Sequence, residues 1–283
     1  MRLFVLTALT MIAFAANSVL NRAALTSGDM TALQFSAIRA LSGAVILLCL
    51  VLLRGTGIAR LRVGSVMGSA CLALYLIGFS LAYRNVDSGI GALILFGGVQ
   101  ITMFAGAVFI RENIPLTRWI GAGCALGGLA YLTWPTGASA PPVLGSLLMT
   151  AAALGWGGYS LIGRGVKDPL AATAANFLGA LVPVVIAVLV FERRVLPPVN
   201  SAFLLAVVSG AITSGLGYAL WYQLLPQLRT TIAAVAQLSV PIIAASGGAF
   251  FLSEGIGPRF WVASALVLGG IALSLLPIRQ SGN

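Results

Sequence analysis

The chain of 283 residues contains no histidine, and only 8% of its residues are charged. The absence of histidine excludes Ser-His and Cys-His catalytic pairs and His-ligated metal sites. The six acidic residues are spread along the chain, and no two are close enough in sequence for an Asp-rich metal-binding motif. The three cysteines lie inside apolar runs and form no CxxC motif. We therefore expect neither an enzyme nor a bound metal or cofactor.

Apolar residues make up 59% of the chain, and the mean hydropathy is +1.04. A soluble domain would carry roughly a quarter charged residues. The apolar runs reach about 20 residues, enough to cross a ~30 Å hydrocarbon core, and they do not alternate with polar residues as barrel strands do. The sequence therefore predicts an all-α integral membrane protein. Its ten predicted transmembrane helices are 3–21, 31–53, 64–83, 89–110, 114–134, 143–163, 169–190, 202–222, 230–252 and 258–277.

The chain also contains an internal duplication. At a constant offset of 142 positions, Glu112, Trp119 and Pro135 recur as Glu254, Trp261 and Pro277. The predicted repeats are 1–140 and 141–283, each with five helices. Because five is odd, the second repeat enters the membrane from the opposite side, so the two are inverted. Inverted repeats are a recurrent architecture of secondary transporters, whose substrate site lies near the midplane between the halves.

The basic residues predict the orientation of the chain. The net charge is +10, but the charges are scattered between the spans, so no nucleic-acid partner is expected. Ten basic residues fall in one set of loops and five in the other, and the more basic loops are expected on the cytoplasmic side. This places both termini of a multi-pass inner-membrane protein in the cytoplasm. The first span could pass for a signal peptide, but its repeat partner at 143–163 indicates that it is retained.

Ten spans, two five-span repeats and a Glu before a Gly-rich fifth span in each repeat resemble the drug/metabolite transporter superfamily, EamA type. The resemblance covers essentially the whole chain. It implies ten helices around a central pathway and the export of metabolites across the inner membrane. Within that family the chain is most similar to the aromatic amino acid exporters.

Arg39 is the one ionisable residue well inside a predicted span. An intramembrane charge costs at least ~2.5–3.5 kcal/mol and needs a partner. Arg39 could anchor a substrate carboxylate, or it could bond to helix carbonyls or to Asp29 or Asp87. Glu112 and Glu254 are expected to cap the helices that follow them, with gating as the alternative.

The other candidate substrate-binding residues are polar or aromatic and lie at mid-depth in the spans. Buried amides need hydrogen-bond partners, which either a solvated pathway or a neighbouring helix can supply. As a set they favour a cavity for a zwitterion with an apolar or aromatic side chain. They are Asn17, Asn21, Tyr75, Tyr83, Gln100, Trp156, Tyr159, Tyr218, Tyr222 and Gln237, and Pro241 is expected to interrupt the helix next to the last of these.

The sequence thus predicts an exporter of small organic metabolites, amino acids with apolar or aromatic side chains being the expected substrates. With no carboxylate or histidine at mid-depth, we expect a facilitator or exchanger that works by alternating access without proton coupling. A multidrug efflux transporter with a more apolar pocket, or a channel, are the alternatives. The expected partners are a small-molecule substrate and the lipid bilayer, and no protein partner is implied.

Overall fold

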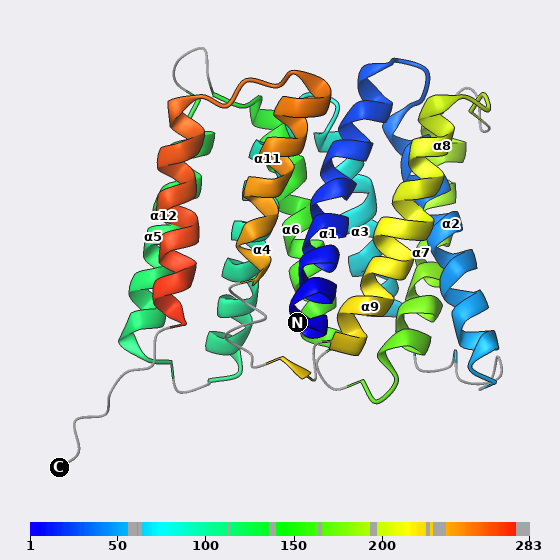
Figure 1. Ribbon diagram of the computed structural model, residues 1–283, viewed down its shortest axis with the longest axis horizontal. Helices are drawn as coiled ribbons and strands as arrows, with labels where there is room; N and C mark the ends of the chain where they lie inside the picture. Colours follow the sequence, from blue (N-terminus) through cyan, green and yellow to red (C-terminus); the bar gives the residue numbers. More distant parts are fainter. Residues whose placement is uncertain are drawn as a thin grey trace.

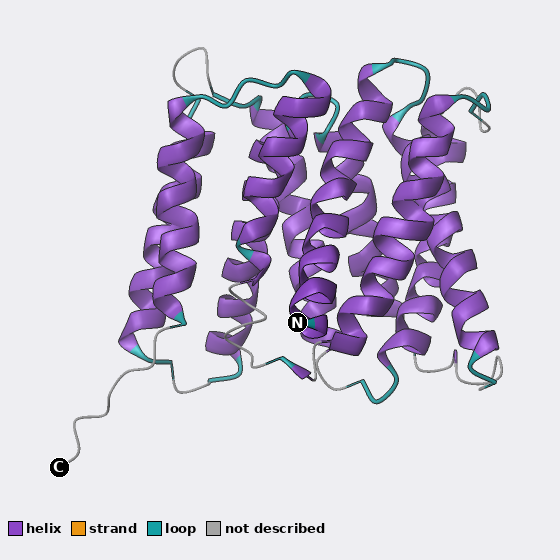
Figure 2. Ribbon diagram, in the orientation of Figure 1, coloured by secondary structure: helices purple, strands orange, loops and turns teal. Residues whose placement is uncertain are grey.

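The computed structural model describes residues 1–55, 61, 64–111, 114–135, 140–163, 166–192, 197–224, 227–228 and 236–275. The regular structure of these residues is entirely helical (Figure 2). In chain order the helices are α1 (Arg2–Thr26), α2 (Ala32–Leu53), α3 (Val66–Ala82), α4 (Ser88–Phe109), α5 (Leu116–Thr133), α6 (Val143–Gly163), α7 (Pro169–Phe191), α8 (Ser201–Val208), the π-helix η2 (Ser209–Leu216), α9 (Gly217–Leu224), α11 (Ser239–Leu252) and α12 (Pro258–Ser274).

Several helices begin where the sequence supplies a side chain that caps them. Thr31 and Gln34 form a capping box at the start of α2. Asp168 accepts a hydrogen bond from the amide of Ala171 in α7, and Asn200 does the same at the start of α8. These caps satisfy amide groups that have no partner within the helix, and they fix the helix ends at the two ends of the bundle.

The outside of the bundle is apolar. Phe4, Leu53, Phe109, Phe191 and Phe250 are each 77–91% exposed, which a water-soluble surface rarely tolerates in such number. By length and composition, α1, α2, α4, α7 and the continuous helix over 201–224 can each cross a membrane, and α3, α11 and α12 are shorter apolar helices. The chain is therefore a multi-pass membrane protein. The full set of ten spans stays a prediction.

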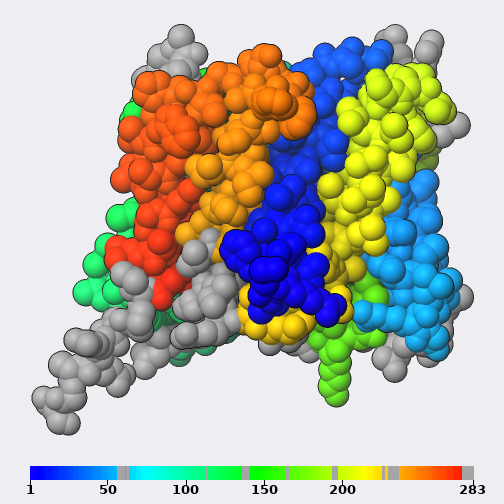
Figure 3. Space-filling model, in the orientation of Figure 1, coloured from blue at the N-terminus to red at the C-terminus, as the bar shows by residue number. Residues whose placement is uncertain are grey.

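The helix pairs follow a regular scheme. The helix α3 packs against α6 and α7, while α8 and η2 pack against α1 and α2. In the same way, the contact of α4 with α6 is matched by that of α1 with α11. In the predicted duplication, α1, α2 and α4 are the counterparts of α6, α7 and α11, and α3 is the counterpart of the 201–224 helix. Each contact is then matched by a contact between the counterparts, as an inverted duplication would give. Figure 3 shows α1 between α11 on one side and the 201–224 helix on the other.

The two ends of the bundle can be followed in Figure 1. The helix α1 begins and α12 ends at the lower end of the view, whereas the turn between α1 and α2 lies at the upper end. The helices α5 and α12 stand side by side at one edge. At the upper end, the Arg259 guanidinium at the start of α12 donates hydrogen bonds to the carbonyls of Tyr131 and Trp134 at the end of α5. A cation at a helix C-terminus stabilises that end of the helix.

Two spans depart from a regular α-helix. The predicted span 202–222 is one continuous helix over 201–224, but its middle eight residues form η2, whose π-type hydrogen bonds bring residues five apart onto one face. In the predicted span 230–252, a turn at Leu238 separates the helical residues 236–237 from α11. Pro241 lies in the first turn of α11, where its missing amide hydrogen has no helical partner to lose. Residues 229–235 lie outside the described part of the chain.

Candidate functional site

Arg39 lies at the centre of the site. It is on α2 and fully buried. Its Nε donates to the hydroxyl of Ser214 at 3.0 Å and its Nη2 donates to the hydroxyl of Tyr75 at 2.8 Å. The guanidinium carbon lies 5.2 Å from the ring centroid of Tyr75 and 4.7 Å from that of Phe79, within the range of cation–π attraction. The alternatives that paired Arg39 with Asp29 or Asp87 are wrong, because the polar side chains beside it are those of Tyr75, Ser214 and Tyr218, from α3, η2 and α9.

The Arg39 charge is not neutralised within the described residues. The third guanidinium nitrogen, Nη1, is buried and has no hydrogen-bond partner there, and no described carboxylate forms an ion pair with the guanidinium. The hydroxyls and ring faces around it compensate only part of the desolvation of a full charge. The guanidinium therefore remains able to bind an anion.

Asn17 on α1 joins Arg39 to η2. The Asn17 Oδ1 lies 2.9 Å from the Ser209 hydroxyl, 2.6 Å from that of Thr213 and 3.2 Å from that of Ser214. Ser209 and Ser214 are five positions apart, so the π-helical spacing of η2 brings both hydroxyls to the same face. Because Ser214 also accepts from Arg39, a continuous hydrogen-bond chain crosses from α1 through η2 to α2.

An aromatic cluster lies beside this chain. The ring of Trp156 on α6 contacts both Tyr75 of α3 and Tyr218 of α9, with centroid distances of 5.0 and 4.9 Å. Tyr159 is 5.5 Å from Trp156, and Phe14 of α1 is 5.7 Å from Tyr218. Such distances are typical of favourable ring contacts. We call Phe14, Tyr75, Trp156, Tyr159 and Tyr218 the aromatic cluster.

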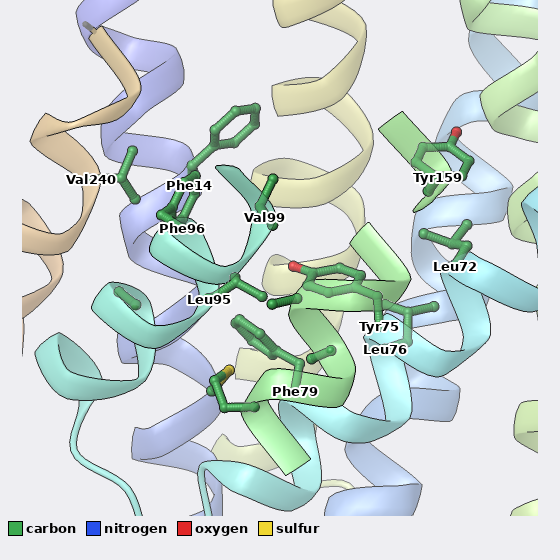
Figure 4. Close-up of a cluster of buried hydrophobic side chains, with 14 of the residues drawn as sticks. Phe14, Leu72, Tyr75, Leu76, Phe79, Leu95, Phe96, Val99, Tyr159 and Val240 are labelled. Atoms are coloured by element: carbon green, nitrogen blue, oxygen red, sulfur yellow. The ribbon is translucent and has the colours of Figure 1, made fainter. Parts of the chain in front are cut away.

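The aromatic cluster continues into an apolar layer. Figure 4 shows Tyr75 and Phe79 of α3 in one cluster of buried side chains with Leu95 and Val99 of α4. The same layer includes Phe14 of α1. The polar chain around Arg39 is therefore bordered by rings and aliphatic side chains from both predicted repeats.

The structure places the remaining candidates in two further groups. Asn21 donates to the Ser80 hydroxyl at 2.9 Å, and Tyr83 donates to the carbonyl of Ser88 at 3.3 Å, both toward the upper end. Tyr222 lies beside Tyr159, whose hydroxyl bonds to Thr173 at 3.2 Å.

Gln100 and Gln237 do not join the chain around Arg39. Both are half-buried, and the hydrogen bonds found among the described side chains include neither amide. Of the candidates, Asn17, Arg39, Tyr75, Trp156, Tyr159 and Tyr218 come together at one place.

Sequence reasoning missed the hydroxyl residues Ser209, Thr213 and Ser214. Serine and threonine within membrane helices usually bond to the carbonyl four residues earlier, as Thr10 and Thr102 do here. Nothing in a single sequence separates those from hydroxyls that reach another helix. The run of small residues SGAITSG over 209–215 was the available signal, although it does not reveal a π-helix.

The upper end of the bundle is held by an ion-pair cluster of Arg22, Asp87 and Glu254. Arg22 on α1 contacts Glu254 at 3.2 Å and Asp87 at 3.4 Å. The other carboxylate oxygen of Glu254 accepts from the Ser88 amide at 2.8 Å. The expectation that Glu254 caps the helix after it is therefore wrong, since it caps α4 instead of α12. Glu112, its repeat counterpart, lies outside the described residues.

Two cavities open at the upper end. One of about 430 Å³ lies between the starts of α4 and α12 and is lined by Asp87, Glu254 and Phe260. The other, of about 810 Å³, lies between the α1–α2 turn and the ends of α3 and α7. Neither is lined by Arg39 or by the aromatic cluster, whose side chains contact one another directly. A substrate would therefore enter the site only when these side chains separate.

An all-helical bundle with an apolar exterior and a buried cation, hydroxyl chain and aromatic cluster is the architecture of a multi-pass membrane transporter. The family model for the EamA-like transporter family matches twice, over residues 2–134 and 143–276. The chain belongs to this family, which agrees with the resemblance found in the sequence. The family is one of transporters, in keeping with the prediction that the chain is not an enzyme.

The relatives agree with this assignment. A protein of Pseudomonas aeruginosa described as uncharacterised is 46% identical over 98% of this chain and 95% of its own length. An uncharacterised transporter of Bacillus subtilis, YwfM, is 26% identical over 76% of this chain and 74% of its own length. A protein crystal structure at 21% identity covers 94% of this chain and 96% of its own, with a TM-score of 0.66, and shows a shared fold.

Proposed function

We propose that the protein exports small organic metabolites that combine a carboxylate with an apolar or aromatic group, by alternating access as a facilitator or exchanger. Amino acids with aromatic or other apolar side chains are the first candidates. The observation that supports this most directly is the buried Arg39 guanidinium, with one unbonded nitrogen, next to the aromatic cluster. An anion-binding group and a ring-binding surface meet there between helices of both predicted repeats.

The same contacts argue against the rival functions. Many substrates of multidrug efflux are apolar cations, and a buried arginine without a carboxylate partner disfavours a second positive charge. A channel needs a continuous pore, whereas Trp156 and its neighbours contact one another across the centre. Purified protein in liposomes distinguishes the two mechanisms. A saturable, competable flux of an aromatic carboxylate supports a carrier, and a flux that never saturates supports a channel.

The first prediction concerns orientation. Because ten basic residues lie in one set of loops and five in the other, both termini should face the cytoplasm. A reporter that is active only in the cytoplasm, fused after Asn283, is expected to be active, and one that is active only outside the inner membrane is expected to be silent. The reverse pattern would show that the lower end of Figure 1 faces outward.

The second prediction concerns the aromatic cluster. Replacing Trp156 with alanine removes ring contacts worth about 0.5–1.5 kcal/mol each beyond their area, so transport of aromatic substrates should weaken several-fold while the protein stays folded. Gln237 does not join the group around Arg39, so Gln237→Ala is expected to leave flux near that of the parent. Trp119→Ala is the matched control, because Trp119 is 52% exposed and packs on Phe104 away from the cluster.

Initial flux into liposomes, normalised to inserted protein, measures all three variants. If Trp156→Ala transports every tested substrate as the parent does, the substrate site lies elsewhere and this side chain serves helix packing. If Trp119→Ala loses as much flux as Trp156→Ala, the loss reflects general damage to the bundle instead.

A further inference from the structure

We infer that the transported species is a net monoanion, an aromatic or similarly flat monocarboxylate without an α-ammonium group, and that the membrane potential drives its export. This inference rests on the proposed carrier function and specifies the charge of the substrate at the same site, so it replaces amino acids as the first candidates with carboxylates that lack the ammonium group. It starts from the charges that the site itself contains.

The site contains one positive charge and no negative charge among the described residues. Asp87 and Glu254 pair with Arg22 at the upper end, and Asp168 caps α7. Asp29 lies in the turn before α2, and Glu192 directly follows α7. Glu112 is the one acid outside the described residues. A bound carboxylate would therefore neutralise Arg39, whereas a zwitterion would also bring an ammonium group into the site.

The polar atoms around Arg39 suit an anion better than an ammonium group. The Arg39 Nη1 has no acceptor within hydrogen-bond distance, and the hydroxyls of Tyr75 and Tyr218 beside the guanidinium are neutral groups that can donate as well as accept. The strongest local acceptor, Asn17 Oδ1, already faces three hydroxyls. Asn21 Oδ1 is a buried acceptor without a partner, but a neutral amide oxygen does not balance a second charge.

The rest of the site suits a flat apolar group. Trp156 is half-buried, whereas Tyr75, Tyr159 and Tyr218, which surround it, are buried. Its ring is thus the member of the aromatic cluster that can move most readily, and in the occupied position a ring of the substrate would stack against it beside Tyr75 and Tyr218. The carboxylate would then lie at the end of that position where Arg39 meets Tyr75.

A monoanionic substrate also explains how export can proceed without a coupling ion. The five described acids lie at helix ends or in the segments between helices, where none can carry a proton through the middle of the bundle. A cell interior that is electrically negative expels anions. A potential of about 100 mV corresponds to roughly a fiftyfold concentration ratio for one charge, so a simple facilitator of an anion becomes an exporter.

The test uses the full chain in liposomes, with a potassium diffusion potential set by valinomycin and no pH gradient. Labelled phenylpyruvate is the monoanion and labelled phenylalanine is the zwitterion with the same ring. We expect phenylpyruvate to accumulate up to roughly fiftyfold when the lumen is positive by about 100 mV. Phenylalanine should show a lower initial rate and no accumulation. Vesicles without protein give the background for both.

Each outcome separates the inference from the proposed function. If phenylalanine is transported as fast as phenylpyruvate and neither responds to the potential, the substrate charge is wrong while the carrier function stands. If neither compound shows a saturable flux, the proposed function fails as well. These measurements use the parent protein and do not depend on whether any variant folds.

Arg39→Gln tests the residue directly. It removes the charge but keeps hydrogen-bond donors, so phenylpyruvate flux should fall roughly tenfold to a hundredfold, the range for losing a charged hydrogen bond. The preference for phenylpyruvate over phenylalanine should disappear. Arg39→Lys should retain part of that preference, and Arg84→Gln is the control because Arg84 is an exposed cation at the upper end. An equal loss for both substrates in Arg39→Gln would show that Arg39 is structural.

Discussion

Gly210→Ala is expected to prevent η2 from packing against α2, so that the protein does not fold, or to destabilise the folded protein by about 3 kcal/mol. This value is in the upper part of the usual range for overpacking. A methyl group on Gly210 in η2 would overlap the backbone carbonyl of Arg39 and the hydroxyl of Ser42 on α2. The Ser42 hydroxyl can rotate away, but the Arg39 carbonyl can move only if α2 itself shifts. Because the Arg39–Ser214 hydrogen bond lies at this same contact, the protein that does fold should also lose transport.

The matched control for Gly210→Ala is Gly269→Ala. Gly269 also lies in a membrane helix, but a methyl group there meets no atom within 4 Å, and alanine is the better helix former by about 1 kcal/mol. Thermal unfolding in detergent and the yield of monodisperse protein compare the two. Equal stability of both variants would mean that η2 and α2 are not packed as closely as described here.

Arg22→Ala is expected to shift the bundle toward a state that is open at its upper end. The substitution removes the cation that pairs with Glu254, whose side chain is only 9% exposed. Breaking a fully buried pair costs about 3–5 kcal/mol, and because Arg22 is itself 17% exposed we expect about 2–3 kcal/mol. This corresponds to a shift of roughly 30- to 150-fold in the equilibrium.

A buried cysteine reports this opening. Ser18 lies one turn below Arg22 on α1 and is 1% exposed. In a chain whose native cysteines are replaced by alanine, Ser18→Cys should react much faster with a charged, membrane-impermeant thiol reagent when Arg22→Ala is also present. Adding Glu254→Gln should reverse part of the effect, because the two changes remove one interaction. Arg84→Ala is the control, and labelling as fast in that variant would contradict the role of the ion pair.

The sequence was sufficient for the parts of this protein that depend on local properties. Helix positions follow from runs of apolar residues, and Arg39 stood out because a charge inside such a run has few explanations. The aromatic candidates Tyr75, Trp156 and Tyr218 do lie together. They were chosen for depth along their spans, and residues at equal depth in neighbouring helices have a good chance of meeting.

The parts that the sequence did not reveal depend on which helices are neighbours. Glu254 was assigned to the helix after it in the chain, but the amide that it caps belongs to Ser88, far earlier in the sequence. An α-helical period would turn Ser214 away from Ser209, so the sequence gives no reason to group their hydroxyls. A π-helix has less favourable backbone hydrogen bonds than an α-helix, and the packing of η2 against α1 and α2 compensates for this. That packing cannot be predicted from the local sequence.

The π-helix also distinguishes the 201–224 helix from α3, its counterpart in the first predicted repeat. An α-helix turns by about 100° per residue, so a change of η2 from π to α geometry would absorb one residue and rotate α9 by about that angle. Tyr218 and Trp221 would turn together, away from Trp156 and Phe14, while α8 kept its place. The corresponding helix of the first predicted repeat, α3, is α-helical over Val66–Ala82 and contains no π-helical segment that could convert in this way. A rotation of α9 about its own axis is therefore expected of the 201–224 helix and not of α3.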